Sequence, residues 1–115
     1  MNQGGRMQLS PEGVLTQLGY HPETTLVEQF QRAAQNTPGF EKISKHLVAL
    51  NDHLKNYHGF VALSNSQPRF KIKIESQDPN TIEVATQEIY KWADKYNVRL
   101  QKVQNAHTYY IVAVA

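Results

Sequence analysis

The chain contains no cysteine in its 115 residues. This absence excludes a disulfide framework and a zinc site with thiolate ligands, and it fits a reducing compartment. Long apolar runs are also missing, because the longest one, residues 109–115, is far too short to cross a bilayer. Residues 1–8 hold no apolar stretch of the kind that forms the core of a signal peptide. We therefore expect a cytoplasmic protein without a membrane partner.

The sequence also has little excess charge. Twelve Lys and Arg residues against ten Asp and Glu residues give a net charge of +2. Residues 1–58 hold five charges of each sign, so the whole excess lies in residues 59–115, which hold seven basic and five acidic residues. This excess is much smaller than a dedicated nucleic-acid-binding domain usually carries.

Catalytic and cofactor-binding motifs are absent from the sequence. It has no glycine-rich phosphate loop of the GxGxxG or GxxxxGK type, no HExxH and no GxSxG. His46 and His53 are seven residues apart, which differs from the i, i+4 spacing of an efficient helical metal site. We expect both histidines to flank an apolar stripe with their polar tips in water. The sequence thus predicts no catalytic residue, no metal and no cofactor.

Helical patterns fill the first half of the chain. Ser10 and Pro11 are typical of a helix start, and Gly19 is typical of a helix end. Apolar residues at helical spacing predict a second helix that ends at residues 36–39 and a third helix over residues 40–57. We expect the second and third helices to form an antiparallel hairpin on a sheet.

Strand patterns dominate the second half. Four short runs have the composition of strands, namely residues 60–64, 69–75, 98–103 and 108–114. Between the second and third runs, Asp78 and Pro79 indicate the start of an amphipathic helix, and Asn97 suits the left-handed position that follows its end. This helix is expected to cover one face of the sheet.

These patterns together predict a single α+β domain over residues 9–115, preceded by a disordered start over residues 1–8. Two to three N-terminal helices are followed by a ββαββ unit. Its four-stranded sheet is expected to be mostly antiparallel, because each pair of strands is joined by a loop of hairpin length.

The last run, residues 108–114, differs from the others because it is apolar on both faces. A strand of this kind is usually central and covered on both sides. We therefore expect it to be a core or interface strand, with the second cover supplied by the N-terminal helices or by a second subunit. The predicted interface residues are Tyr109, Tyr110, Val112 and Val114.

Basic residues line the polar face of the second run. Arg69, Lys71 and Lys73 alternate with apolar residues there, and Arg99 has a similar place in the third run. Proteins that bind single-stranded RNA or DNA combine such cations with aromatic rings on an exposed sheet. The aromatic RNP1 pattern is absent, however. Lysines on an edge strand also prevent unwanted strand pairing, which is a purely structural reason for them.

Three functions are compatible with these patterns. The first expectation is a non-catalytic protein-interaction or regulatory module that forms a homodimer or binds a partner protein. The alternative is a nucleic-acid-binding protein that uses the basic strand residues. The third is a small-ligand binder or small enzyme with a pocket near Trp92, Tyr57 and His53, although an apolar helix face packed on a sheet explains Trp92 more simply.

Overall fold

A computed structural model describes residues 10–115, so the predicted disorder of residues 1–8 lies outside the described part of the chain. The helices are α1 (Pro11–Gln17), α2 (Thr24–Gln35), α3 (Ser44–Leu54) and α4 (Pro79–Lys95), with 3-10 turns η1 (Phe40–Lys42) and η2 (Lys55–Tyr57). The strands are β1 (Gly59–Leu63), β2 (Phe70–Ile74), β3 (Val98–Lys102) and β4 (Thr108–Val114).

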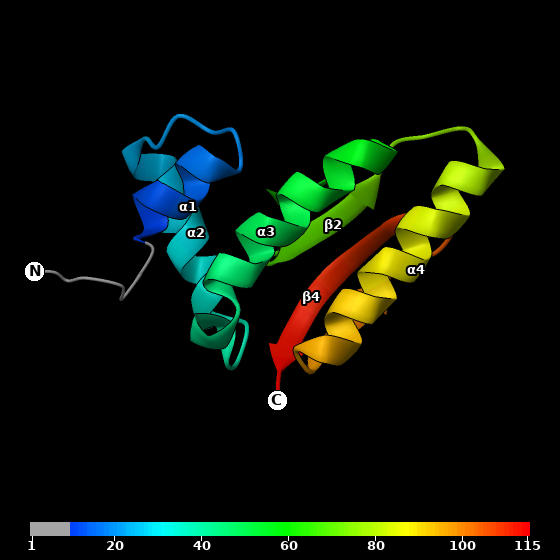
Figure 1. The fold of residues 1–115 in the computed structure, drawn as a ribbon. Coiled ribbons are helices and arrows are strands. Elements are labelled where there is room, and N and C mark those ends of the chain that lie inside the picture. Colours follow the sequence, from blue (N-terminus) through cyan, green and yellow to red (C-terminus); the bar gives the residue numbers. More distant parts are fainter. Residues whose placement is uncertain (1–9) are drawn as a thin grey trace, which may run out of the picture.

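The four strands form one antiparallel sheet in the order β1-β2-β4-β3. The hairpins β1–β2 and β3–β4 are joined through α4, and β2 pairs with β4 in the middle of the sheet (Figure 1). The predicted α+β class is confirmed, with helices first and a ββαββ unit after them. The central position of β4 also agrees with the expectation from its two apolar sides.

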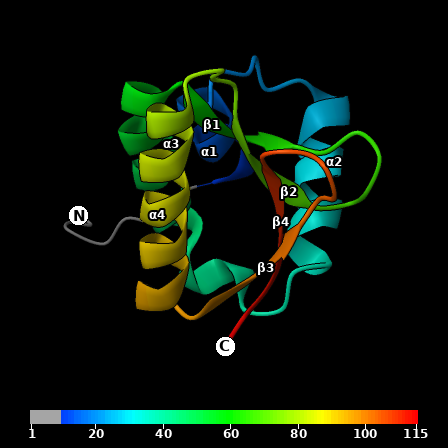
Figure 2. The ribbon, with the colours of Figure 1, turned by 90° about the vertical axis from the view of Figure 1, so that its right-hand side faces the viewer.

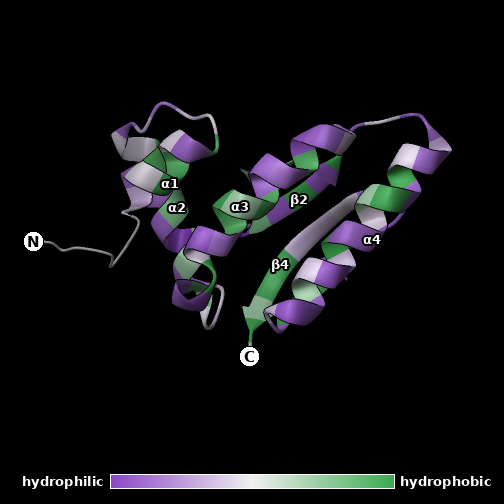
Figure 3. Cartoon of the chain, viewed as in Figure 1, coloured by the Kyte–Doolittle hydropathy of each residue, from purple (hydrophilic) through white to green (hydrophobic). Residues whose placement is uncertain are grey.

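Helices α3 and α4 cover one face of the sheet (Figure 2). Along β2, Phe70, Ile72 and Ile74 are at most 4% exposed, whereas Lys71 and Lys73 between them are only half-buried. Apolar and polar positions alternate along α3 and α4, as in helices with one buried face (Figure 3). None of the helices in residues 10–115 has the length and apolar character needed to cross a membrane.

Both predicted helix starts have the expected caps. The N–H of Gly13 donates to Ser10 Oγ at 3.0 Å, and the N–H of Thr81 donates to Asp78 Oδ2 at 3.1 Å. These bonds satisfy backbone groups that the first turn of a helix leaves without partners. The hydrogen bonds from Thr81 also lower the pKa of Asp78. Asn97 has the predicted left-handed conformation after α4, with a φ of 57°.

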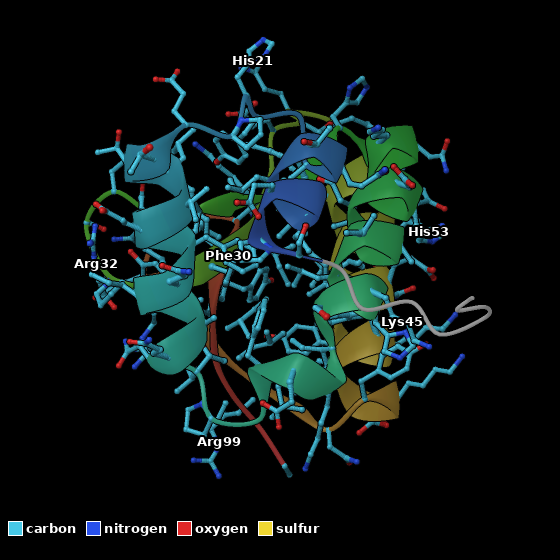
Figure 4. All side chains as sticks on the ribbon, turned by 90° about the vertical axis from the view of Figure 1, so that its left-hand side faces the viewer. His21, Phe30, Arg32, Lys45, His53 and Arg99 are labelled. Carbon is cyan, nitrogen blue, oxygen red and sulfur yellow. The ribbon has the colours of Figure 1, made fainter. Side chains whose placement is uncertain are left out.

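The predicted hairpin of the second and third helices is wrong. Helix α1 packs against both α2 and α3 and lies between them (Figure 4). The third predicted helix is also interrupted at Ile43, where a φ of −122° separates η1 from α3. Phe30 of α2 packs edge-to-face on Phe40 and Phe70, with ring centroids 5.7 and 5.1 Å away. These aromatic contacts hold α2 at the end of the sheet, beside the β1–β2 hairpin.

Strand β1 lies at an edge of the sheet, and side chains take the place of a neighbouring strand. The Val61 N–H donates to Asn51 Oδ1 at 2.8 Å, and the Leu63 N–H donates to the Tyr20 hydroxyl at 3.1 Å. Asn51 itself is only 3% exposed. Buried backbone donors require such partners. The β1 edge is therefore protected against pairing with another chain. Strand β3 forms the other edge of the sheet.

The loop between α2 and η1 crosses the end of β4. The Val114 N–H donates to the Pro38 carbonyl oxygen at 2.7 Å. Gly39 follows with a φ of 79°, and a Cβ atom at this position would overlap the carbonyl oxygen of Val114. The N-terminal helices are thus attached to a central strand through a contact that only glycine permits.

Replacing Gly39 with alanine tests this contact, and Gly19→Ala is the matched control. Both glycines have a positive φ, 79° and 97°, but nothing lies within 4 Å of a Cβ built at Gly19. We expect Gly19→Ala to lower the free energy of unfolding by roughly 1–2 kcal/mol through backbone strain alone. Gly39→Ala should lower it by roughly 2–5 kcal/mol, because the overlap adds to the strain. Urea denaturation measures both values, and equal losses would contradict the close contact.

Candidate functional site

The side chains that alternate with the core residues of the strands form the second face of the sheet, which we call the open face. Helices α3 and α4 lie on the opposite side of the strands, and α2 lies near the open face only beside the β1–β2 hairpin (Figure 2). None of the side chains on the open face is fully buried. They belong to Phe60, Ala62, Lys71, Lys73, Arg99, Gln101, Thr108, Tyr110 and Val112.

The strand register places two pairs of a ring and a cation next to each other on the open face. Phe60 lies opposite Lys73 across β1 and β2, and Lys71 lies opposite Tyr110 across β2 and β4. Opposed side chains in an antiparallel pair have Cβ atoms about 4.5–5.5 Å apart. Lys71 and Lys73 are separated by about 7 Å along β2, since each residue of a strand advances by about 3.4 Å. Each of the two lysines on β2 therefore has one aromatic ring beside it, on β1 for Lys73 and on β4 for Lys71.

Three of the four predicted nucleic-acid-binding residues lie on the open face, Lys71 and Lys73 on β2 and Arg99 on the edge strand β3. Lys71 and Lys73 are half-buried, and Arg99 is exposed and projects outward (Figure 4). Lys73 Nζ is 3.4 Å from Glu75 Oε2, but both side chains are at least 40% exposed. Such an exposed ion pair is weak. All three cations are thus available to an anionic partner.

Arg69, the fourth predicted residue, has backbone partners instead. Its Nη1 donates to the carbonyl oxygens of Val112 at 3.2 Å and Asn36 at 3.4 Å. The guanidinium group therefore connects β4 to the end of α2. This arrangement gives Arg69 a structural role, and an alternating strand pattern contains no signal for it.

The four predicted interface residues of β4 are divided between the two faces of the sheet. Tyr109 and Val114 are 1% and 6% exposed in the core of the chain itself. Tyr110 and Val112 are half-buried on the open face. A shift in the β3–β4 register beside Leu100 changes the alternation before Val114, which brings Val114 to the core side. The apolar character of β4 therefore arises largely from burial within one chain.

The Tyr110 hydroxyl group belongs to a small polar network at the edge of the open face. It shares a hydrogen bond of 3.0 Å with Ser66 Oγ, which in turn lies 3.2 Å from Ser64 Oγ. Hydrogen bonds with Ser66 and Ser64 lower the pKa of Tyr110, and the positive charge of Lys71 adds to this effect. Sequence reasoning missed the other ring, Phe60, although the alternation in β1 assigns it to the same face.

The third predicted site also corresponds to a feature of the structure. Trp92 and His53 line a groove between α3 and α4. Tyr57 does not line the groove but packs edge-on against the His53 ring, with centroids 5.7 Å apart. Among residues 10–115, no group of three or more His, Asp or Glu side chains is arranged to hold a metal ion.

Comparison with protein-family models, curated proteins and solved structures found no match to the chain. The fold and the arrangement of its side chains are then the features that indicate a function. They define an α+β domain with one packed sheet face and one open, basic sheet face.

The tyrosine network leads to a testable pKa difference. We expect Ser66→Ala to raise the pKa of Tyr110, because it removes the largest interaction that favours the phenolate. Lys71→Gln should raise this pKa by a smaller amount. Carbon-13 NMR of the tyrosine rings during a pH titration measures both changes, with Ser76→Ala in a distant loop as the control. An unchanged Tyr110 titration in Ser66→Ala would contradict the hydrogen bond.

Proposed function

We propose that this chain is a non-catalytic binding module that holds single-stranded nucleic acid on the open face of its sheet. The observation that carries the proposal is the pairing of two cations, each with an aromatic ring, on one accessible surface. Phe60 and Tyr110 each lie opposite a lysine in the strand register. Bases stack on aromatic rings while cations follow the phosphates, and this combination is what sheet surfaces use to bind single strands.

The charge of the open face favours an anionic partner over a second copy of the chain. Lys71, Lys73 and Arg99 lie on it, and Glu75 at the end of β2 is the only acidic side chain within 4.0 Å of any of these cations in residues 10–115. A two-fold dimer through this face would set the same cations against each other. Like charges brought together across an interface are destabilising.

Replacing Lys71 and Lys73 together with glutamate tests the proposal. We expect the unaltered protein to bind single-stranded oligonucleotides with a slope of log K against log salt of about −2, from three phosphate contacts at about −0.7 each. The double variant should bind about tenfold more weakly or worse, with a slope near −0.7. Fluorescence anisotropy at several salt concentrations measures both quantities.

The matched control is the double variant Lys45→Glu and Lys55→Glu, which changes the net charge by the same amount on α3 and η2. It should retain most of the affinity, because long-range attraction is screened at moderate salt. Tyr110→Ala should weaken binding by about 1–3 kcal/mol through lost stacking, with the salt slope preserved. Absence of salt-dependent binding, or equal losses in the two double variants, would contradict the proposal.

Self-association, the leading function predicted from the sequence, is the second candidate. The observation that favours it is the pair of neighbouring apolar side chains Val112 and Ala113 on β4, which are both half-buried in the isolated chain. A second copy that covered these two side chains would gain apolar burial but would also meet the cations described above.

Light scattering separates the two candidates. We expect a monomer of 13.1 kDa, because the cations of the open face oppose a symmetric contact. A dimer mass that Val112→Asp reduces to the monomer mass would instead support self-association. Circular dichroism of Val112→Asp serves as the control for folding, and Val84→Asp on the exposed side of α4 is the matched surface variant.

A further inference from the structure

A groove of about 310 Å³ lies between α3 and α4, on the side of the molecule opposite the open face. Ala49 and Leu50 of α3 and Trp92 of α4 form its apolar part. Trp92 is 9% exposed, and its Nε1 donates to the His46 carbonyl oxygen at 3.1 Å. This bond fixes the orientation of the indole ring. The volume lies within the range of small-molecule sites.

Flat aromatic groups form one end of the groove. The His46 ring stacks on the Tyr96 ring with centroids 4.0 Å apart and planes inclined by 16°. Trp92 meets Tyr96 at 5.9 Å in an edge arrangement. The three rings come from α3, from α4 and from the residue directly after α4, and they support one another, so these surfaces are already in place before any ligand binds.

Some of the charged side chains around the groove have a partner of opposite charge in the described part of the chain, and others do not. Glu88 is the one carboxylate in the lining, and it is bound by His53 at 2.7 Å and by Lys91 at 3.2 Å. The hydrogen bond from His53 is the main reason that the pKa of Glu88 is lowered, and Lys91 adds to it. Lys95 also lines the groove, and no carboxylate of residues 10–115 lies within 4.0 Å of its ammonium group.

The pKa of the His46 ring is affected by this excess of positive charge. Burial lowers the pKa of His46, and Lys45 and Lys95 lower it further by repelling the imidazolium form. The stacked ring is therefore a neutral, flat surface at neutral pH, beside the Lys95 ammonium group, which has no carboxylate within 4.0 Å among residues 10–115. A ligand that suits both features is flat, apolar over most of its surface and negatively charged at one end.

We propose that the groove between α3 and α4 binds a small aromatic carboxylate. Its ring packs against Trp92 and the stacked pair of His46 and Tyr96, and its carboxylate pairs with Lys95. This site is separate from the open face, since the two lie on opposite sides of the sheet.

Trp92 is the only tryptophan of the chain, so its fluorescence reports directly on the groove. The probe is 2-naphthoate, and the comparison compound is 2-naphthylmethanol, which has the same ring system without the charge. We expect saturable quenching of Trp92 by naphthoate and at least tenfold weaker binding of the neutral alcohol. In proton NMR, bound naphthoate should also raise the pKa of His46, because a nearby anion favours the imidazolium form.

Two variants localise the site. Lys95→Gln should weaken naphthoate binding several-fold and should leave the affinity for the alcohol unchanged. Ala49→Phe fills the groove from an exposed position of α3 and should abolish binding of both compounds. The Lys71→Glu, Lys73→Glu double variant on the open face should bind naphthoate like the unaltered protein.

Three outcomes would overturn the proposal. These are the absence of saturable quenching at millimolar naphthoate, equal affinity for the neutral alcohol, and binding that persists unchanged in both Lys95→Gln and Ala49→Phe. If Ala49→Phe does not fold, as judged by circular dichroism, Lys95→Gln and the His46 titration still decide the question. Because these readouts do not involve the open face, the result is independent of nucleic-acid binding.

Discussion

The side-chain alternation of β2 is the constraint on which both faces of the molecule depend. Phe70, Ile72 and Ile74 point into the core, and Lys71 and Lys73 point away from it. A slip of one residue would exchange the two sets. Burial of two unpaired ammonium groups is far more costly than the apolar burial of a short strand is favourable. Because β2 is central, its register also positions β1 and β4, and the basic open face follows directly from formation of the core.

Features with a local cause could be predicted from the sequence. Asp78 and Asn97 mark the ends of α4 because each acts on backbone groups within one turn of itself. The position of α2 has no such local cause. It depends on contacts of Phe30 with Phe40 and Phe70, the latter forty residues away in the chain. The spacing of apolar residues within a helix carries no information about a contact so far away in the sequence. The predicted helical hairpin was therefore wrong, whereas the predicted order of the elements was correct.

The candidate sites show the same division. Alternation was enough to assign Lys71 and Lys73 to one face, since a strand pattern determines which way each side chain points. Alternation could not show that Arg69 is structural while these lysines are available to a partner, because Arg69 donates to a carbonyl oxygen of Val112 on another strand. Alternation alone also did not single out Phe60 as a binding residue, although the strand register places its ring opposite Lys73. Partners on neighbouring strands, rather than residue types, distinguish a structural cation from an available one.

Although the net charge is only +2, the molecule has two surfaces with available cations, the open face and the groove between α3 and α4. They differ in shape and lie on opposite sides of the sheet. On the open face, cations and rings are spread over several strands, so a long, flexible polyanion can meet many of them at once. In the groove, Glu88 already has two cationic partners, whereas the Lys95 ammonium group has no carboxylate within 4.0 Å in the described part of the chain. A concave, apolar site with one uncompensated charge suits a single small anion. A nucleic-acid strand would bury too little of itself in that groove. Shape, more than charge, therefore separates what the two surfaces can bind.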